Sequence, residues 1–84
     1  MTNNLITLYT TTWCGYCKNL KKQLLAKNIP FQEVDIEQDP KAAEHVGKIN
    51  GGDQIVPTLE FWDSTTMTNP RISDVESKLA ERQS

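Results

Sequence analysis

The chain has 84 residues and a mass of 9.5 kDa, which allow one small domain with a thin core. Apolar residues make up 37% and charged residues 24%, which lies outside the composition of disordered chains. A net charge of −2 excludes a general affinity for nucleic acid, and the apolar runs are too short for a transmembrane helix.

The chain is expected to form a single domain over residues 1–84. Its first ten residues have no basic region and no long apolar stretch, so they do not predict a secretory signal. We therefore expect a cytoplasmic protein, in a compartment where thiols are kept reduced. In that setting Cys14 and Cys17 are too few and too close together to form a disulfide framework.

Charge is distributed unevenly along the chain. Residues 1–30 carry four lysines and no acid, whereas residues 31–84 carry eleven acids against five basic residues. The four lysines are Lys18, Lys21, Lys22 and Lys27. The local positive charge thus follows directly after the cysteines.

The first predicted elements are a strand and a helix. Residues 5–9 are rich in branched and aromatic side chains, which favours a buried strand, and residues 10–13 form a loop. A helix is predicted over residues 15–27, and Asn28 and Pro30 end it. Its apolar positions follow helical spacing and are Tyr16, Cys17, Leu20, Leu24 and Leu25.

A second strand and a second helix follow. Residues 31–36 alternate between apolar and polar side chains, which predicts a strand. Asp39 is the expected N-cap of the helix, with Pro40 at its first position, and residues 50–52 end it. The apolar positions of this helix are Ala42, Ala43, Val46 and Ile49.

The last third of the chain predicts a hairpin and a helix. Residues 58–62 and 65–67 are expected strands joined by a turn at 63–64, and residues 69–70 open the final helix. The apolar face of that helix carries Ile72, Val75 and Leu79.

The order of elements is β-α-β-α-β-β-α. A strand–helix–strand unit favours a right-handed crossover and parallel pairing, whereas the close last two strands must pair antiparallel. The prediction is an α/β fold with a four-stranded mixed sheet flanked by three helices.

The segment Cys14-Gly15-Tyr16-Cys17 lies where the first strand ends and the first helix begins. A helix N-terminus leaves backbone N–H groups unpaired and carries partial positive charge, which favours a thiolate at the cap. Cys14 is the expected exposed nucleophile, and Cys17, one turn later, could close a disulfide with it. Such a pair can carry out thiol–disulfide exchange through a mixed disulfide.

The two cysteines have three other interpretations. Free cysteines can be small buried hydrophobic residues. A structural bridge across four residues would contribute only about 2 kcal/mol. A zinc site needs four ligands, and only His45 joins Cys14 and Cys17 as a ligand of the right type, so no metal site is predicted. His45 itself is expected to be solvated.

Several neighbours of the cysteines are candidate functional residues. Lys18 and Lys21 could favour a thiolate through opposite charge, or could simply line a solvated helix face. Trp13 could be a platform for a partner or a packing residue. Because most X–Pro bonds are trans, Pro57 is expected to be trans, and the Val56 backbone could pair with an extended substrate.

These residues resemble those of glutaredoxins, the small members of the thioredoxin fold, over essentially the whole chain. The pattern is most similar to that of mycoredoxins, the glutaredoxin-like proteins of mycothiol-producing bacteria. The segments that carry the resemblance are residues 10–17, 33–37, 50–52, 56–58 and 68–70.

The resemblance implies roles that spacing alone does not show. Pro57 would be a cis proline facing the active site, with the Val56 backbone pairing to the bound thiol. Cys14 would be the nucleophile and Cys17 the resolving or auxiliary thiol. Tyr16 would line the site for a low-molecular-weight thiol, and Thr68 and Asn69 would close it.

Two departures from glutathione-dependent glutaredoxins bear on the thiol used. A Gly-Gly pair followed by Asp is usual at the last helix start, whereas this chain has Met67-Thr68-Asn69-Pro70, where Thr68 or Asn69 could cap the helix. Hydroxyl and amide side chains suit a sugar-bearing thiol, which favours mycothiol over glutathione. Gly15 replaces the usual active-site proline and loosens the turn.

The expected function is reduction of mixed disulfides between proteins and mycothiol, with no tightly bound cofactor and mycothiol as co-substrate. S-mycothiolated proteins are the expected partners of a monomeric chain, and a mycothiol disulfide reductase with NADPH would act indirectly. One alternative is a dithiol redoxin reduced directly by a thioredoxin-type reductase. A second is a dimeric scaffold that carries an iron–sulfur cluster through Cys14.

Overall fold

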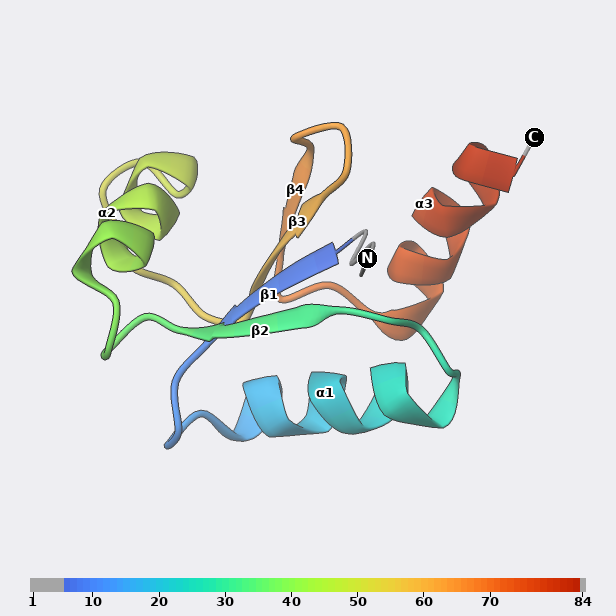
Figure 1. The fold of residues 1–84 in the computed structure, drawn as a ribbon, viewed down its shortest axis with the longest axis horizontal. Coiled ribbons are helices and arrows are strands. Elements are labelled where there is room, and N and C mark those ends of the chain that lie inside the picture. Colours follow the sequence, from blue (N-terminus) through green and yellow to red (C-terminus); the bar gives the residue numbers. More distant parts are fainter. Residues whose placement is uncertain (1–5, 84) are drawn as a thin grey trace.

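The computed structural model describes residues 6–83, which form a four-stranded sheet and three helices (Figure 1). The elements in chain order are β1 (Ile6–Thr10), α1 (Gly15–Ala26), β2 (Gln32–Asp35), α2 (Pro40–Ile49), β3 (Thr58–Phe61), β4 (Thr66–Thr68) and α3 (Ile72–Gln83). The predicted order of elements is confirmed. No helix within this part of the chain is long and apolar enough to cross a membrane.

The strands lie in the order β2-β1-β3-β4. β1 pairs in parallel with β2, as the crossover through α1 predicts, and antiparallel with β3. β3 and β4 form the predicted antiparallel hairpin. The sheet is therefore mixed, with the parallel pair on one side and the hairpin on the other.

Apolar side chains form two clusters, one on each face of the sheet. The larger cluster joins Leu20 and Leu24 of α1 to Val75 of α3 over Leu8 and Leu59 of the central strands. The smaller cluster joins β1 and α2 and contains Tyr9, Ile36 and Val46. Burial of these side chains holds α1 and α3 on one face and α2 on the other.

The boundaries of the first elements differ slightly from those predicted. β1 extends to Thr10, whose carbonyl accepts a hydrogen bond from the N–H of Ile36 at 3.0 Å, and residue 5 lies outside the described residues. α1 ends one residue early because Asn28 adopts a left-handed conformation with φ 56°. β2 spans only residues 32–35, which pair with Thr7–Thr10 of its one neighbouring strand.

The hairpin and the start of α3 also differ from the prediction. β3 ends at Phe61 and β4 covers 66–68, because a wider turn closes with the Phe61 N–H bonded to the Thr65 carbonyl at 2.8 Å. α3 begins at Ile72, where Asp74 accepts a hydrogen bond from the Arg71 N–H at 3.0 Å. The prediction that Thr68 or Asn69 caps this helix is therefore wrong.

The predicted apolar stripe of α1 is correct only in part. Cys17, Leu20 and Leu24 are buried, but Tyr16 and Leu25 are exposed. Helical spacing alone could not separate them, because which of two adjacent apolar positions is covered depends on how the helix sits on the sheet.

Candidate active site

Cys14 is the N-cap residue of α1. Its backbone is extended, with φ −80° and ψ 112°, and its sulfur accepts a hydrogen bond from the Cys17 N–H at 3.1 Å. This N–H is one of the donors that a helix N-terminus leaves unpaired. The placement of the motif at the start of a helix is thus confirmed, and both thiols are free.

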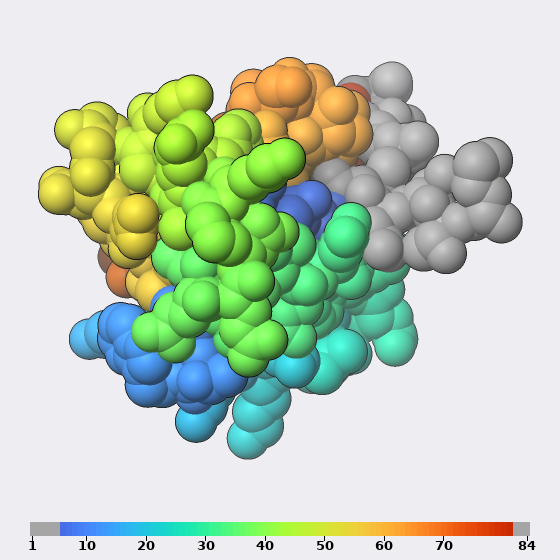
Figure 2. Space-filling model, turned by 60° about the vertical axis from the view of Figure 1, so that its left-hand side comes forward, coloured from blue at the N-terminus to red at the C-terminus, as the bar shows by residue number. Residues whose placement is uncertain are grey.

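The segment before β3 lies against the same sulfur. The Cys14 Sγ lies 3.9 Å from the carbonyl oxygen of Val56, at the distance of a weak thiol hydrogen bond. The Val56–Pro57 peptide bond is cis, so the expectation of a trans bond is wrong and the implication of the resemblance is correct. In the space-filling view, the blue loop after β1 and the yellow segment before β3 meet at the surface beside α2 (Figure 2).

Both cysteines are buried. Cys14 is 4% exposed and Cys17 is 1% exposed, so the expectation of an exposed Cys14 is wrong. The difference arises from tertiary structure, because the Val56 carbonyl, 42 residues away in the sequence, lies 3.9 Å from the Cys14 sulfur at the first turn of α1. Part of the Cys14 surface still reaches solvent.

The environment of Cys17 favours its neutral form. Burial, followed by a hydrogen bond with Cys14, raises the pKa of the Cys17 thiol to about 11, against the lowering effect of hydrogen bonds with Thr10 and Thr11. Cys17 is therefore a protonated thiol at neutral pH.

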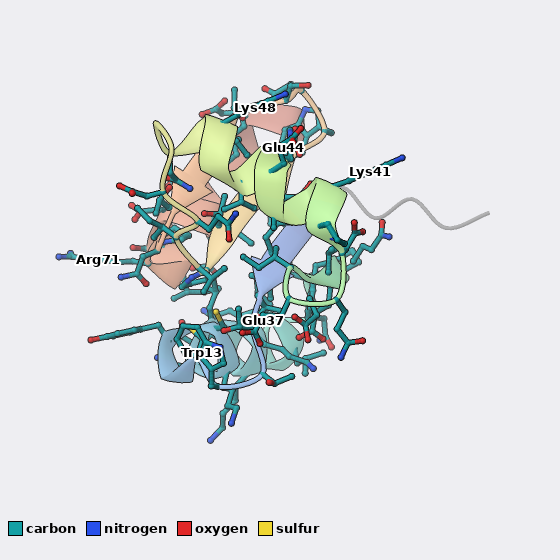
Figure 3. The ribbon with its side chains drawn as sticks, turned by 90° about the vertical axis from the view of Figure 1, so that its left-hand side faces the viewer. Trp13, Glu37, Lys41, Glu44, Lys48 and Arg71 are labelled. Carbon is teal, nitrogen blue, oxygen red and sulfur yellow. The ribbon has the colours of Figure 1, made fainter. Side chains whose placement is uncertain are left out.

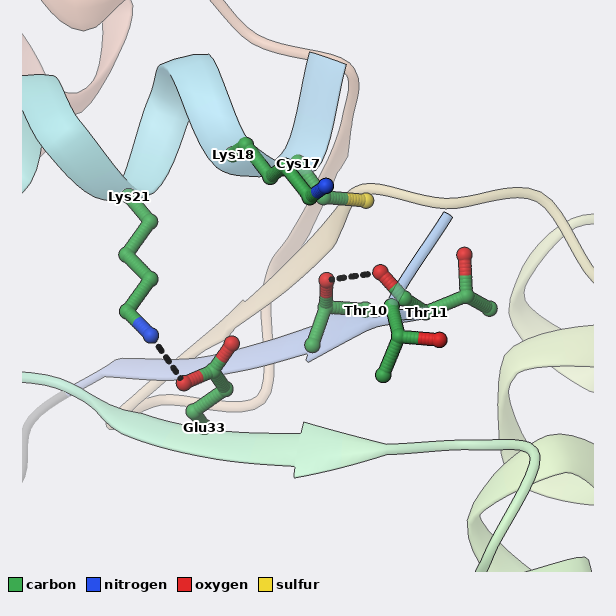
Figure 4. Close-up of a pocket in the computed structure, with 7 residues that line it drawn as sticks. Thr10, Thr11, Cys17, Lys18, Lys21 and Glu33 are labelled. Carbon is green, nitrogen blue, oxygen red and sulfur yellow. Dashed lines mark hydrogen bonds and ion pairs between the residues drawn. The ribbon is translucent and has the colours of Figure 1, made fainter. Parts of the chain in front are cut away.

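A cavity of about 230 Å³ lies beside Cys17, between α1, the end of β1 and β2 (Figure 4). Lys21 points across it and pairs with Glu33 of β2 at 2.8 Å. Lys18 also lines it, so both lysine candidates lie on the Cys17 side of the motif. Thr11 Oγ1 is buried there, and it has no hydrogen-bond partner among residues 6–83.

Trp13 precedes Cys14, Tyr16 lies between the two cysteines, and these aromatic residues are 68% and 72% exposed. The Trp13 indole N–H donates a hydrogen bond to Glu37 Oε2 at 2.9 Å, and the two side chains lie together at the start of α1 (Figure 3). The backbone of Glu37 is fixed as well, because its N–H donates a hydrogen bond to Asp35 Oδ1 at 2.9 Å. This role of Glu37 is not predicted by the sequence pattern, because Glu37 is 24 residues from Trp13 and meets it only in the folded chain.

Thr68 and Asn69 lie beside the cis proline. The Asn69 N–H donates to the Pro57 carbonyl at 2.8 Å, and Asn69 has a left-handed backbone with φ 48°. The Thr68 hydroxyl donates to Asn50 Oδ1 at 2.6 Å. The structure thus brings Thr68, Asn69, Val56 and Pro57 together.

His45 lies away from the cysteines, on the α2 face. Its side chain is 44% exposed, in line with the expectation, but its Nε2 is 2.9 Å from Glu60 Oε1. The Tyr9 hydroxyl donates to the same oxygen at 3.1 Å. Burial and this hydrogen bond raise the pKa of Tyr9 to about 12.

Within residues 6–83, no three His, Cys, Asp or Glu side chains lie close enough together to hold a metal ion.

The glutaredoxin family model matches residues 6–63, which include the cysteine pair and the cis proline. The chain belongs to the glutaredoxin family. It is 51% identical over 76 residues to a Mycobacterium tuberculosis protein named as a glutaredoxin, with 90% of each chain covered. It is 39% identical over 74 residues to Mycoredoxin 1 of Corynebacterium glutamicum, with 88% of this chain and 91% of that protein covered.

Solved structures show the same fold. The thioredoxin-like protein BC3987 superposes with a TM-score of 0.73 at 22% identity, over 86% of this chain and 96% of that one. A variant of the same protein gives a TM-score of 0.78 at 19% identity, over 93% and 97%. The chain is thus a glutaredoxin-like thiol–disulfide oxidoreductase with a thioredoxin-like fold.

Proposed function

We propose that this glutaredoxin-like protein reduces mixed disulfides between proteins and mycothiol. The observation that carries the proposal is the environment of the Cys14 sulfur. This sulfur accepts a hydrogen bond from the Cys17 N–H at a helix N-terminus and lies beside the Val56 carbonyl. The 39% identity to Mycoredoxin 1 supports mycothiol as the small thiol. The hydroxyl of Thr68 and the amide of Asn69 near Pro57 suit a sugar-bearing ligand.

The reaction proceeds in two exchanges. The Cys14 thiolate attacks the mycothiol sulfur of the mixed disulfide, the S–S bond breaks, and the protein leaves as a thiolate that takes up a proton. Cys14 then holds mycothiol in a new disulfide. A second mycothiol thiolate attacks this mycothiol sulfur, forms mycothiol disulfide and releases the Cys14 thiolate. An NADPH-dependent mycothiol disulfide reductase returns the small disulfide to thiols.

Cys17 is an auxiliary thiol in this cycle. Its pKa of about 11 keeps it protonated at neutral pH, so its attack on the Cys14–mycothiol disulfide competes poorly with a second mycothiol. When it does attack, a Cys14–Cys17 disulfide forms and mycothiol leaves. Each chain acts alone, as a monomer.

The neighbouring residues bind the two substrates. The Val56 backbone pairs with the bound thiol next to Pro57, and Tyr16 lines its site. Thr68 and Asn69 close that site, and Trp13 contacts the protein substrate. Lys18 adds positive charge near the thiol pair, whereas much of the charge of Lys21 is neutralised by Glu33.

The decisive experiment compares one protein substrate carrying either mycothiol or glutathione as its mixed disulfide. We expect kcat/KM for the mycothiolated form to be at least about tenfold higher, equivalent to about 1.4 kcal/mol in the transition state. Equal values for the two forms would contradict the choice of mycothiol.

Three further measurements separate the alternatives. Turnover with a thioredoxin-type reductase and NADPH, without any small thiol, would favour a dithiol redoxin. Visible absorption of anaerobically purified protein would favour a dimeric iron–sulfur scaffold. A function that survives alkylation of Cys14 by iodoacetamide would exclude thiol chemistry at this site altogether.

A further inference from the structure

The side chain of Asn50 joins three elements at the end of α2. Its amide Nδ2 donates to the Val46 carbonyl at 3.1 Å and to Thr58 Oγ1 at 3.2 Å. Its Oδ1 accepts from the Thr68 hydroxyl at 2.6 Å. The amide group of Asn50 thus connects α2 to β3 and β4, acting as both a donor and an acceptor of hydrogen bonds.

Thr58 continues this chain of hydrogen bonds toward the active site. It is fully buried and directly follows the cis proline. Its hydroxyl accepts from Asn50 and donates to the Ile55 carbonyl at 2.8 Å, which closes the segment from Ile55 to Thr58 into a tight loop. The carbonyl of Val56, 3.9 Å from the Cys14 sulfur, lies within this loop.

We propose that Asn50 is a positioning residue for thiol–disulfide exchange, acting through Thr58 to hold the Val56–Pro57 segment beside Cys14. The hydrogen bonds run in one direction, from the Thr68 hydroxyl to the Asn50 oxygen, and from the Asn50 amide through the Thr58 hydroxyl to the Ile55 carbonyl. Only a side chain with both an acceptor and a donor completes this path.

The same path links the two sides of the binding site. Thr68 is joined to Asn50 through its hydroxyl, and the next residue, Asn69, donates its N–H to the Pro57 carbonyl at 2.8 Å. Asn50 therefore holds both the loop before β3 and the end of β4, the two segments that flank the bound disulfide. A buried hydroxyl such as that of Thr58 would be left partly unsatisfied without it.

The inference rests on disulfide exchange at Cys14, and does not depend on which small thiol is used. The hydrogen bond from the Cys17 N–H to Cys14 lies within α1, apart from Asn50. Loss of Asn50 should therefore impair binding of a disulfide substrate, whereas a looser Val56 segment beside Cys14 should not slow alkylation of its sulfur. These two effects can be measured separately.

The test measures reduction of a mixed disulfide between a fluorescent peptide thiol and 2-mercaptoethanol, with dithiothreitol as reductant. Asn50→Asp keeps the shape but loses the amide donors, so we expect KM to rise at least about fivefold with kcat within about twofold of wild type. The iodoacetamide alkylation rate of Cys14 should be no lower than in wild type, because a looser Val56 segment leaves the sulfur at least as accessible. Asn19→Ala, on the exposed face of α1, is the matched control and should leave all three unchanged.

Thr58 provides a second, independent pair of variants. Thr58→Val removes the hydroxyl and should reproduce the rise in KM, whereas Thr58→Ser keeps the hydroxyl and should restore the wild-type value. Val75→Ala, in the core cluster away from Asn50, controls for general loss of stability. An unchanged KM in Asn50→Asp and Thr58→Val, or an equal rise in Val75→Ala, would overturn the proposal. Because mycothiol is absent from this assay, failure of the mycothiol assignment would not affect its result.

Discussion

The backbone N–H of Cys17 donates a hydrogen bond to the sulfur of Cys14 at 3.1 Å. The donor is a main-chain group, so residue 17 supports the Cys14 sulfur whatever side chain it carries. The aligned peptide dipoles of α1 also favour a negative charge on the Cys14 sulfur, because the N-terminal end of a helix attracts negative charge. The roles of the two cysteines can therefore be distinguished by replacing each of them separately.

Replacing Cys17 by Ser should preserve most of the turnover of a mycothiolated substrate, because the Cys17 N–H remains in place. Replacing Cys14 by Ser should abolish turnover, since the attacking sulfur is lost. The measurement is the initial rate of each variant on the same substrate with saturating mycothiol. Near-complete loss of activity in Cys17→Ser would instead indicate an obligatory Cys14–Cys17 disulfide and a dithiol cycle.

The raised pKa of Cys17 predicts loss of stability at alkaline pH. In the unfolded chain this thiol ionises near pH 9, whereas in the folded chain its pKa is about 11, so only the unfolded state loses the proton between these values. The free energy of unfolding should therefore be constant below about pH 9 and fall as pH rises toward 11.

Urea denaturation at several pH values from 8 to about 10 checks this, before the raised pKa of Tyr9 contributes its own share. Cys17→Ser has no thiol to ionise at this position and should show a flatter profile over the same range. A slope that is the same in both proteins would show that Cys17 is not the cause.

The hydrogen bond between Trp13 and Glu37 should matter for protein substrates more than for stability. Both side chains are at the surface, so Glu37→Ala should change the free energy of unfolding by less than about 1 kcal/mol. A freely rotating Trp13 ring is a poorer contact surface, and we expect KM for a protein mixed disulfide to rise about two- to fivefold. Urea denaturation and steady-state kinetics measure the two effects.

Glu44→Ala is the matched control for this prediction, because Glu44 is an exposed carboxylate on α2 that points away from Trp13 (Figure 3). It should leave KM unchanged. An equal rise in KM in both variants would mean that net charge, and not the position of Trp13, determines substrate binding.

The ion pair between Lys21 and Glu33 predicts a small role for Lys21 at the thiols. Its ammonium group is 2.8 Å from a Glu33 carboxylate oxygen, which neutralises much of its charge. Lys21→Met should therefore change the rate of Cys14 alkylation by less than about twofold and cost less than about 1 kcal/mol of stability. Lys22→Met, at an exposed position of the same helix, is the control. A rate that falls severalfold only in Lys21→Met would show that this lysine does favour the thiolate.

The order of elements and the reactive pair were accessible from the sequence because both depend on local signals. Helical spacing, the Asp39 cap with Pro40 and the Asn50 stop define α2 within its own residues. Cys14 at the N-cap of α1 follows equally from a strand that ends just before a helix begins. The hydrogen bond from the Arg71 N–H to Asp74 at the start of α3 is local as well, but Thr68 and Asn69 before Pro70 match the usual pattern of a helix cap and so predict a different one.

The tertiary structure alone decided how the rest of the site is assembled. The Val56 carbonyl reaches Cys14 across 42 residues, and Glu37 reaches Trp13 across 24. Burial of Cys14 and the path from Asn50 through Thr58 arise in the same way, from segments that meet only when β3 pairs with β1 and α2 packs on the sheet. Short-range patterns encode dihedral angles and caps, whereas such contacts depend on strand order and packing, which exist only in the folded chain.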